Sequence, residues 1–257
     1  MKKTSFLGSE KPLLTCMVQA YTPDRVKELI SLSLPDGAEA FGMQFCKMEA
    51  EYRNKKTYKE LFEYAKPYPV YVTNYRHGVN KEKSDELLAN ELLELAECGA
   101  TLCDVMGDYF DPCEGELTMN EDAVKKQIKL IEELHATGAE VLMSSHVLKF
   151  TPAERVLEIA LEHQRRGADI CKIVTGASNM SEQIENLRII NLLKENLKIP
   201  FLFLAGGECN IMRRLGGELG CCMYLCVYEY DELSTKSQPL IKDVRILREI
   251  LKKQNGR

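Results

Sequence analysis

Apolar runs and amphipathic segments alternate without a break along this 257-residue chain. Each apolar run has the length of a buried β-strand, and each segment between two runs carries its apolar residues at helical spacing. Eight such pairs occur, which in number and total length match an α/β fold of the (β/α)8 TIM-barrel class, formed by residues 1–257 as a single domain. The predicted strands cover residues 13–19, 38–45, 69–74, 100–106, 140–146, 168–174, 199–207 and 221–227.

Two other architectures are compatible with part of this pattern. An open, doubly wound parallel sheet also alternates strands and helices, but eight repeats favour the closed barrel. The length alone would also fit two ordinary domains, although no linker-like boundary stands out in the sequence. No glycine-rich loop of the G-x-G-x-x-G or G-x-x-x-x-G-K type follows a predicted strand, so we expect no nucleotide cofactor, and no other cofactor is implied.

Helix start signals support the assignment of the intervening segments. Thr22 precedes a proline and is a predicted N-cap. Thr151 precedes a second proline, and Glu154 completes a capping box with it. The predicted helices begin after Thr22, cover residues 56–66, 84–98 and 120–137, begin again at Thr151, and cover residues 181–197, 210–219 and 239–253.

Composition narrows the classes of partner. The net charge is −5 and no basic block occurs, which argues against a nucleic acid or an anionic membrane as the partner. No apolar run is long enough for a membrane span and the first residues lack an apolar signal segment, so a soluble, cytoplasmic protein is expected. The 10 cysteines form no C-x-x-C pair and no Cys/His ligand spacing, so no metal site is predicted and most are interpreted as core residues of a protein in a reduced compartment.

The fifth and sixth predicted strands place a histidine and a lysine side by side. His146 ends the run E-V-L-M-S-S-H, and Lys172 lies within A-D-I-C-K-I-V, with one amphipathic helix between them. An ammonium group among apolar neighbours is costly to bury, so a share of Lys172 should be neutral amine able to attack a carbonyl. The pattern therefore indicates Schiff-base chemistry, with Cys171 on the opposite face of the strand. The structural alternatives are a lysine that reaches solvent and a histidine that only makes hydrogen bonds.

Polar residues also follow the other predicted strands. In a barrel, such residues gather at the carboxyl ends of the strands, where the active site lies. Arg214 is one candidate, and its neighbour Arg213 is the alternative at the same place. His77, His135 and His163 are interpreted as surface residues. The remaining candidates are Asn74 and Arg76 after the third strand, Asp104 and Asp108 around the fourth, and Ser234 and Gln238 after the eighth.

At these residues the chain resembles the type I 3-dehydroquinate dehydratases. V-L-M-S-S-H-V-L-K-F-T-P is similar to the histidine strand of that family, and A-D-I-C-K-I-V to its Schiff-base lysine strand. R-R-L-G-G-E-L-G resembles its arginine helix and S-T-K-S-Q its final substrate loop, so the resemblance covers about residues 140–254. The four segments occur in the family's order at closely similar spacing.

The resemblance implies a barrel enzyme whose lysine, here Lys172, forms an imine with the substrate ketone. It implies that His146 removes the α-proton and then protonates the departing hydroxyl. It also implies that Arg214, Ser234 and Gln238 hold the substrate carboxylate, and it suggests a homodimer. The physical properties of these groups agree, because a protonated imine makes the α-proton accessible to a histidine and arginine binds carboxylates in a two-pronged geometry.

The N-terminal half departs from the family pattern. Where the second strand of the family ends in a Glu-x-Arg pair that contacts substrate hydroxyls, this chain has Gly42 and Gln44. After the third strand the family has an arginine, for which Arg76 is available after a one-residue shift, and then a glutamate that orients the histidine. No glutamate follows Arg76 at that spacing, so Asp104 or Asp108 is the candidate partner of His146.

Three hypotheses follow. The leading one is a carbon–oxygen lyase that dehydrates 3-dehydroquinate to 3-dehydroshikimate, a step of the shikimate pathway, through a Lys172 imine. The second keeps the imine but assigns another oxo acid to a divergent lyase or aldolase, because Gly42 and Gln44 replace the hydroxyl-contacting pair. The third is a ligand-binding paralogue with little activity, motivated by the missing histidine partner.

Overall fold

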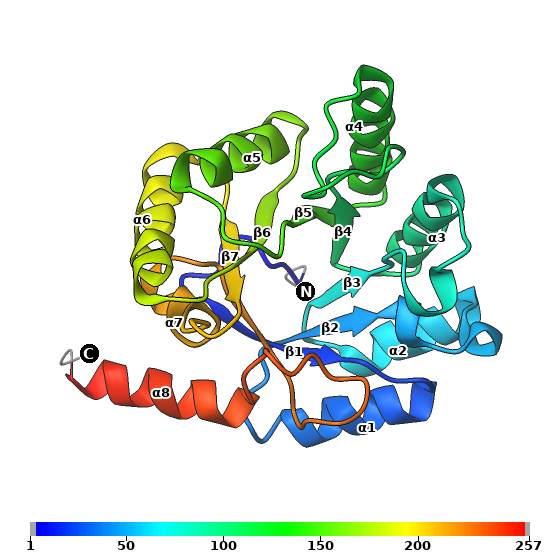
Figure 1. The fold of residues 1–257 in the computed structure, drawn as a ribbon. Coiled ribbons are helices and arrows are strands. Elements are labelled where there is room, and N and C mark those ends of the chain that lie inside the picture. The colour runs from blue at the N-terminus through cyan, green and yellow to red at the C-terminus, as the bar shows by residue number, and fades with distance from the viewer. Residues whose placement is uncertain (1–3, 255–257) are drawn as a thin grey trace.

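The computed structural model describes residues 4–254, which form a (β/α)8 barrel (Figure 1). Parallel strands surround the barrel axis, and α-helices form the outer ring, as the alternation in the sequence predicts. The strands are β1 (Leu13–Val18), β2 (Ala40–Gln44), β3 (Val70–Thr73), β4 (Leu102–Met106), β5 (Glu140–His146), β6 (Ile170–Gly176), β7 (Phe201–Gly206) and β8 (Met223–Cys226). The helices are α1 (Pro23–Ser33), α2 (Lys55–Ala65), α3 (Asp85–Glu97), α4 (Glu121–Ala136), α5 (Ala153–Arg165), α6 (Met180–Asn196), α7 (Met212–Leu219) and α8 (Ile241–Gln254), with 3₁₀ turns η1 (Phe45–Lys47), η2 (Ala50–Tyr52) and η3 (Gly78–Asn80).

The strands pair in the order β7-β6-β5-β4-β3-β2-β1-β8, and each described pairing is parallel. Between β7 and β8 the backbone N–H of Cys222 donates to the carbonyl of Phe201 at 2.9 Å, which brings the two ends of the sheet together. In this order β2 and β6 are separated by three strands on one side, so they lie across the barrel from each other. This arrangement decides which side chains face each other in the interior.

The N-terminal end of the barrel is covered by the segment that precedes β1. The side chain of Phe6 is buried, and its ring packs edge-on against Tyr71, with 6.5 Å between ring centroids. The backbone N–H of Phe6 donates to Glu140, the first residue of β5, at 2.9 Å. Because this segment covers the amino ends of the strands, access to the interior is from the carboxyl ends.

The helix start signals give a mixed result. Thr22 caps α1 as predicted, since its hydroxyl accepts a backbone N–H of the first turn. The capping box predicted at the start of α5 is wrong. Thr151 instead donates to a backbone carbonyl two residues earlier, and Glu154 pairs with Arg188 of α6. The first N–H of α5 is bound by Glu185 of α6, so a neighbouring helix supplies the cap that the local sequence was expected to supply.

His163 is fully buried between α5 and the barrel, so its interpretation as a surface residue is wrong. The hydroxyl of Ser145 donates to a backbone carbonyl and lies 3.0 Å from His163 Nε2, while Cys171 Sγ lies 3.4 Å from Nδ1. Both ring nitrogens thus have partners without a charge on the ring, and burial, with a smaller effect of the nearby Arg166, lowers the pKa of His163 to about 3. The contact also confirms that Cys171 faces α5, away from the barrel interior.

Most cysteines are core residues, as predicted, and Cys113 is exposed. In residues 4–254, no cluster of His, Cys, Asp or Glu side chains is arranged to hold a metal ion. Within the same range, no helix combines the length and apolar character needed to cross a bilayer.

Candidate active site

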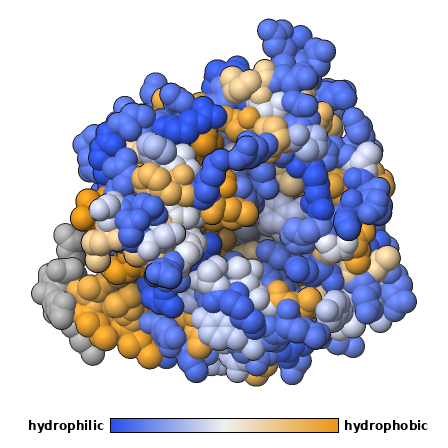
Figure 2. Space-filling model, in the orientation of Figure 1, coloured by the Kyte–Doolittle hydropathy of each residue, from blue (hydrophilic) through white to orange (hydrophobic). Residues whose placement is uncertain are grey.

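A cavity of about 740 Å³ lies at the carboxyl ends of the strands. The face drawn in Figure 2 is hollowed near its centre, over the barrel. Four of the predicted site residues line the cavity, whereas Arg214 and Ser234 do not; the four are Lys172, His146, Arg76 and Gln238. The structure therefore brings together most, but not all, of the side chains that the sequence singled out.

Lys172 lies at the floor of the cavity and is only 4% exposed. Its Nζ donates to the hydroxyl of Tyr75 at 2.6 Å and to that of Tyr71 at 3.1 Å, and it lies 3.2 Å from Asp104 Oδ2. The expected apolar surroundings of the ammonium are therefore wrong. Strand β6 is apolar on both sides of Lys172, but the side chain reaches across the interior to polar groups of β3 and β4.

Asp104 provides the countercharge for Lys172. Its carboxylate accepts hydrogen bonds from the hydroxyls of Tyr71, Tyr75 and Ser144. Burial alone would raise the pKa of Asp104, but the Lys172 ammonium and these hydroxyls keep it below the ordinary value. Burial, reinforced by the Asp104 charge, raises the pKa of both tyrosines well above 10, so both phenols remain protonated donors.

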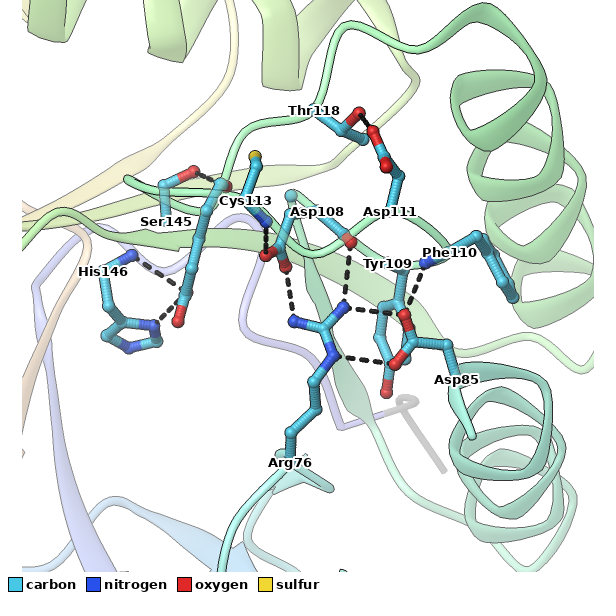
Figure 3. Close-up of polar contacts among 12 residues, drawn as sticks. Arg76, Asp85, Asp108, Tyr109, Phe110, Asp111, Cys113, Thr118, Ser145 and His146 are labelled. Carbon is cyan, nitrogen blue, oxygen red and sulfur yellow. Dashed lines mark hydrogen bonds and ion pairs between the residues drawn. The ribbon is translucent and has the colours of Figure 1, made fainter. Parts of the chain in front are cut away.

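His146, at the end of β5, is paired with Glu116. The Nδ1 atom of His146 lies 2.7 Å from Glu116 Oε2, and the backbone N–H of His146 donates to the same oxygen at 3.0 Å (Figure 3). Although burial opposes it, His146 lowers the pKa of Glu116, which stays ionised at neutral pH. A carboxylate at Nδ1 leaves Nε2 of the neutral ring free to accept a proton.

Glu116 is a candidate site residue that the sequence analysis did not identify. The predicted partners of His146 were wrong, because Asp104 pairs with Lys172 and Asp108 pairs with Arg76. Glu116 belongs to the long irregular segment between β4 and α4 and has a left-handed backbone with a φ of 49°. The only signal in the sequence was that such a segment follows the strand next to β5, with a glutamate within reach.

The arginine of the cavity is Arg213, at the start of α7. Arg214 is exposed and donates to Asn210, so its predicted role in carboxylate binding is not supported by its position. Arg213 is 7% exposed, lines the cavity, and donates from Nε to the carbonyl of Ala205 at 3.0 Å. Burial lowers the pKa of Arg213 to about 10, which leaves it protonated at neutral pH. The structure therefore favours Arg213, the alternative to Arg214, as the arginine of the cavity.

The loop after β8 contributes Gln238 but not Ser234. Ser234 Oγ hydrogen-bonds to the backbone of Asp231 and stabilises the loop itself. Gln238 is 5% exposed, and its Oε1 has no partner among the described residues. Thr175, at the end of β6, likewise lines the cavity with an unpartnered hydroxyl. These buried polar groups, like Arg213, line the cavity and are available to a ligand.

A sequence model of the family described as "Type I 3-dehydroquinase" matches residues 45–255. The chain belongs to this family. It is 33% identical over 112 residues to the 3-dehydroquinate dehydratase of Alkaliphilus oremlandii, covering 43% of each chain. It is 28% identical over 146 residues to that of Syntrophotalea carbinolica, covering 56% of this chain and 53% of the relative. The matches thus span about half the length of these curated relatives.

Solved structures show the same fold over almost the whole chain. The 3-dehydroquinate dehydratase of Geobacillus kaustophilus superposes with a TM-score of 0.81 at 16% identity, covering 96% of this chain and 93% of that one. The type I 3-dehydroquinate dehydratase of Clostridium difficile, solved with covalently modified comenic acid, gives a TM-score of 0.79 at 17% identity, covering 96% and 95%. The (β/α)8 barrel is therefore the fold of the type I 3-dehydroquinase family.

Strand β2, on one side of the cavity, carries Gly42 and Gln44. A side chain at Gly42 would place its Cβ 2.3 Å from Met17 Sδ and 3.2 Å from Tyr71, so the flexible end of Met17 now occupies that space and would have to move. Gln44 lines the cavity and is half-buried. Gln44 therefore contributes to the cavity wall directly, whereas at Gly42 the wall is formed by the neighbouring Met17 and Tyr71.

Arg76 also lines the cavity, but its charge is compensated. Its Nε and Nη1 atoms lie 2.7 Å from Asp85 and Asp108, respectively, and Nη2 donates to the Asp108 carbonyl at 2.8 Å (Figure 3). Most of its donors are used in holding α3 to the segment after β4. Arg76 is therefore at the predicted place but is occupied by protein partners.

Proposed function

We propose that this protein is a hydro-lyase that forms an imine between Lys172 and a keto acid and then eliminates water. The reference reaction is the dehydration of 3-dehydroquinate to 3-dehydroshikimate in the shikimate pathway. The observation that carries the proposal is a buried lysine at the floor of a cavity, one strand away from a histidine that is already paired with a carboxylate. Membership of the type I 3-dehydroquinase family supports it.

Imine formation starts with the transfer of a proton from the Lys172 ammonium, for which the Tyr75 hydroxyl and Asp104 provide a route. The neutral amine attacks the substrate ketone, the C–N bond forms, and the carbonyl oxygen leaves as water. The protonated imine then carries the same positive charge as the original ammonium. Asp104 therefore stabilises the intermediate as it stabilises the resting lysine.

Elimination uses the His146–Glu116 pair. The free Nε2 of His146 takes the proton from the carbon next to the imine, and the electron pair moves to the imine nitrogen to give an enamine. Glu116 stabilises the imidazolium that forms. The enamine then expels the hydroxyl at the next carbon, His146 protonates it, and water leaves. Hydrolysis of the product imine returns Lys172 to its resting state.

Arg213 is the proposed ligand of the substrate carboxylate. Its guanidinium is buried, and no described acidic side chain lies within ion-pair distance. An incoming carboxylate would therefore supply hydrogen bonds and a countercharge in place of the water that burial has removed. Gln238, Ser237 and Thr175 also line the cavity, and we propose that their polar atoms complete the binding of the carboxylate. In this proposal Arg213 takes the role expected for Arg214, and Ser237 that expected for Ser234.

The imine can be trapped. We expect that incubation of the protein with 3-dehydroquinate and borohydride gives a reduced adduct of one substrate per chain, located on Lys172 by peptide mapping, and that enone absorbance of the product appears without borohydride. Intact mass spectrometry measures the adduct. Folded protein that gives no adduct with dehydroquinate or any other oxo acid would contradict the proposal, and an adduct on a different lysine would contradict the assignment.

A second candidate keeps the imine and changes the substrate. The observation that favours it is the β2–β3 side of the cavity, where Gly42 offers no side chain and Arg76 is held by two aspartates. Trapping with other oxo acids, but not with dehydroquinate, would favour a divergent lyase or aldolase. The ligand-binding hypothesis loses its motivation, because Glu116 supplies the histidine partner that was thought to be missing.

We also propose that the protein acts in the cytoplasm as a homodimer. Free thiols throughout the described chain are compatible with a reducing compartment. On α8, Ile246 and Ile250 are each 48% exposed, and an apolar patch is visible over this helix at the lower left of Figure 2. Such a patch is typical of an interface. Light scattering is expected to give twice the monomer mass of 29.2 kDa, and a monomer at micromolar concentration would contradict the proposal.

A further inference from the structure

Four lysine and arginine side chains line the cavity, and two of them lack a countercharge. Lys172 and Arg76 are paired with aspartates, as described above. Lys47 and Arg213 also line the cavity, but among the described residues neither has an acidic side chain within ion-pair distance. The one acidic side chain in the lining, that of Glu116, is paired with His146. The protein thus leaves two positive charges of its cavity uncompensated.

These two cations belong to different sides of the barrel. Lys47 ends η1, directly after β2, whereas Arg213 lies on α7 and is bonded to Ala205 of β7. In the strand order, β2 and β7 are separated by four strands on one side and by β1 and β8 on the other. Lys172 reaches from β6 to Tyr71 of β3 and to Tyr75 just after β3, so its Nζ lies in the interior between the two sides. A ligand bound to Lys172 can therefore extend toward both cations.

The surroundings of Lys47 supply further donors. Gln44 pairs in register with Thr73 across β2 and β3, and both line the cavity. The Thr73 side chain is fully buried, yet its Oγ1 has no partner among the described residues. An amide and an unpartnered hydroxyl beside a cation are the groups that complete the coordination of an anionic oxygen.

His77 is held next to Lys47 by the packing of η1 on the segment before η3. His77 Nε2 lies 3.8 Å from Cys46 Sγ, and Gly78 has a φ of +60°. A Cβ at Gly78 would come within 2.3 Å of the Cys46 carbonyl oxygen, so only glycine permits this approach. Burial, and then the Lys47 charge, lower the pKa of His77. The neutral ring can donate a hydrogen bond without adding a charge.

We propose that Lys47, Gln44, Thr73 and His77 form a second anion-binding subsite, and that the preferred substrate is an oxo acid with an acidic group at each end. One acidic group binds Arg213, the other binds Lys47, and the ketone between them meets Lys172. This inference rests on the proposed imine chemistry, whose substrate class it specifies. A carboxylate and a phosphate present the same anionic oxygens, so the test includes both.

The test compares the concentration dependence of borohydride trapping for matched pairs of probes. The dicarboxylates are 2-oxoglutarate, 2-oxoadipate and 2-oxopimelate, each against the 2-oxo monoacid of the same chain length. The phosphate pair is 2-oxo-3-deoxy-6-phosphogluconate and its unphosphorylated form, and 3-dehydroquinate is the reference monoacid. We expect at least one doubly acidic probe to reach half-maximal trapping at about tenfold lower concentration than its partner, as one additional charge-assisted hydrogen bond predicts.

Two variants test whether Lys47 causes the preference for doubly acidic probes. Lys47→Met is expected to remove the preference for the doubly acidic probe, so that the probe and its monoacid reach half-maximal trapping at similar concentrations. Lys81→Met is the control, because Lys81 is an exposed lysine that follows η3, in the loop after β3, and does not line the cavity. Equal trapping of both members of every pair, or a preference that persists in Lys47→Met, overturns the second subsite but leaves the imine intact. Absence of any adduct in the folded wild-type protein overturns the proposed function itself.

Discussion

Replacing Lys172 with methionine is expected to eliminate imine formation and to lower the dehydration rate by at least about 10⁴-fold, because the covalent electron sink is lost. Methionine has nearly the length of lysine and keeps the stem packed in β6. The measurements are borohydride trapping and turnover of the best substrate. An adduct that persists in Lys172→Met would show that another lysine forms the imine.

The same substitution is expected to destabilise the fold, which has to be separated from the chemical effect. Asp104 would remain fully buried without its countercharge, and breaking a buried ion pair costs about 3–5 kcal/mol. The hydroxyls of Tyr71, Tyr75 and Ser144 still bind the carboxylate, so the lower end of that range is expected.

The double variant Lys172→Met/Asp104→Asn provides the control. Removal of the second charge is expected to recover most of the lost free energy of unfolding, measured in urea, while trapping and turnover stay absent. Equal stability of the single and double variants would show that Asp104 does not depend on Lys172 for its countercharge. Recovery of activity in the double variant would contradict the imine mechanism.

The barrel and the reactive pair were predictable from the sequence, because both depend on patterns that are local in the chain. The alternation of strands and helices fixes the barrel, and neighbouring parallel strands must carry Lys172 and His146 to the same end of the sheet. The two-residue periodicity of a strand likewise placed Cys171 opposite Lys172. These predictions needed no knowledge of how distant side chains meet.

The partners of the reactive pair were not predictable in this way. Asp104 reaches Lys172 across the barrel interior, and Glu116 reaches His146 from an irregular segment with a left-handed turn. Neither contact follows from periodicity. Adjacent side chains on a helix point about 100° apart. Whether Arg213 or Arg214 faces the cavity therefore depends on how α7 is rotated about its axis. The interpretation of His163 as a surface residue was wrong for a similar reason, because α5 turns this polar side chain towards the barrel.

Replacing Glu116 with glutamine is expected to lower the rate of dehydration by about 10²- to 10⁴-fold while imine formation on Lys172 continues. Glu116 fixes His146 through Nδ1 and stabilises its positive charge during proton transfer. A glutamine has the same shape but no charge, and its amide can present a donor where Nδ1–H needs an acceptor. The proton-transfer step should therefore slow, whereas the attack of Lys172, which Glu116 does not contact, should not.

Imine formation and proton transfer can be measured separately in Glu116→Gln. Because the imine forms but is not processed, the adduct trapped from Glu116→Gln should reach at least the wild-type yield although product appears slowly. Glu114→Gln is the matched control, since Glu114 is exposed, belongs to the same segment and pairs only with Lys149 among the described residues. A parallel loss of trapping and turnover in Glu116→Gln would indicate that Glu116 only holds the segment in place. Loss of turnover with the adduct retained would assign Glu116 to the proton transfer by His146.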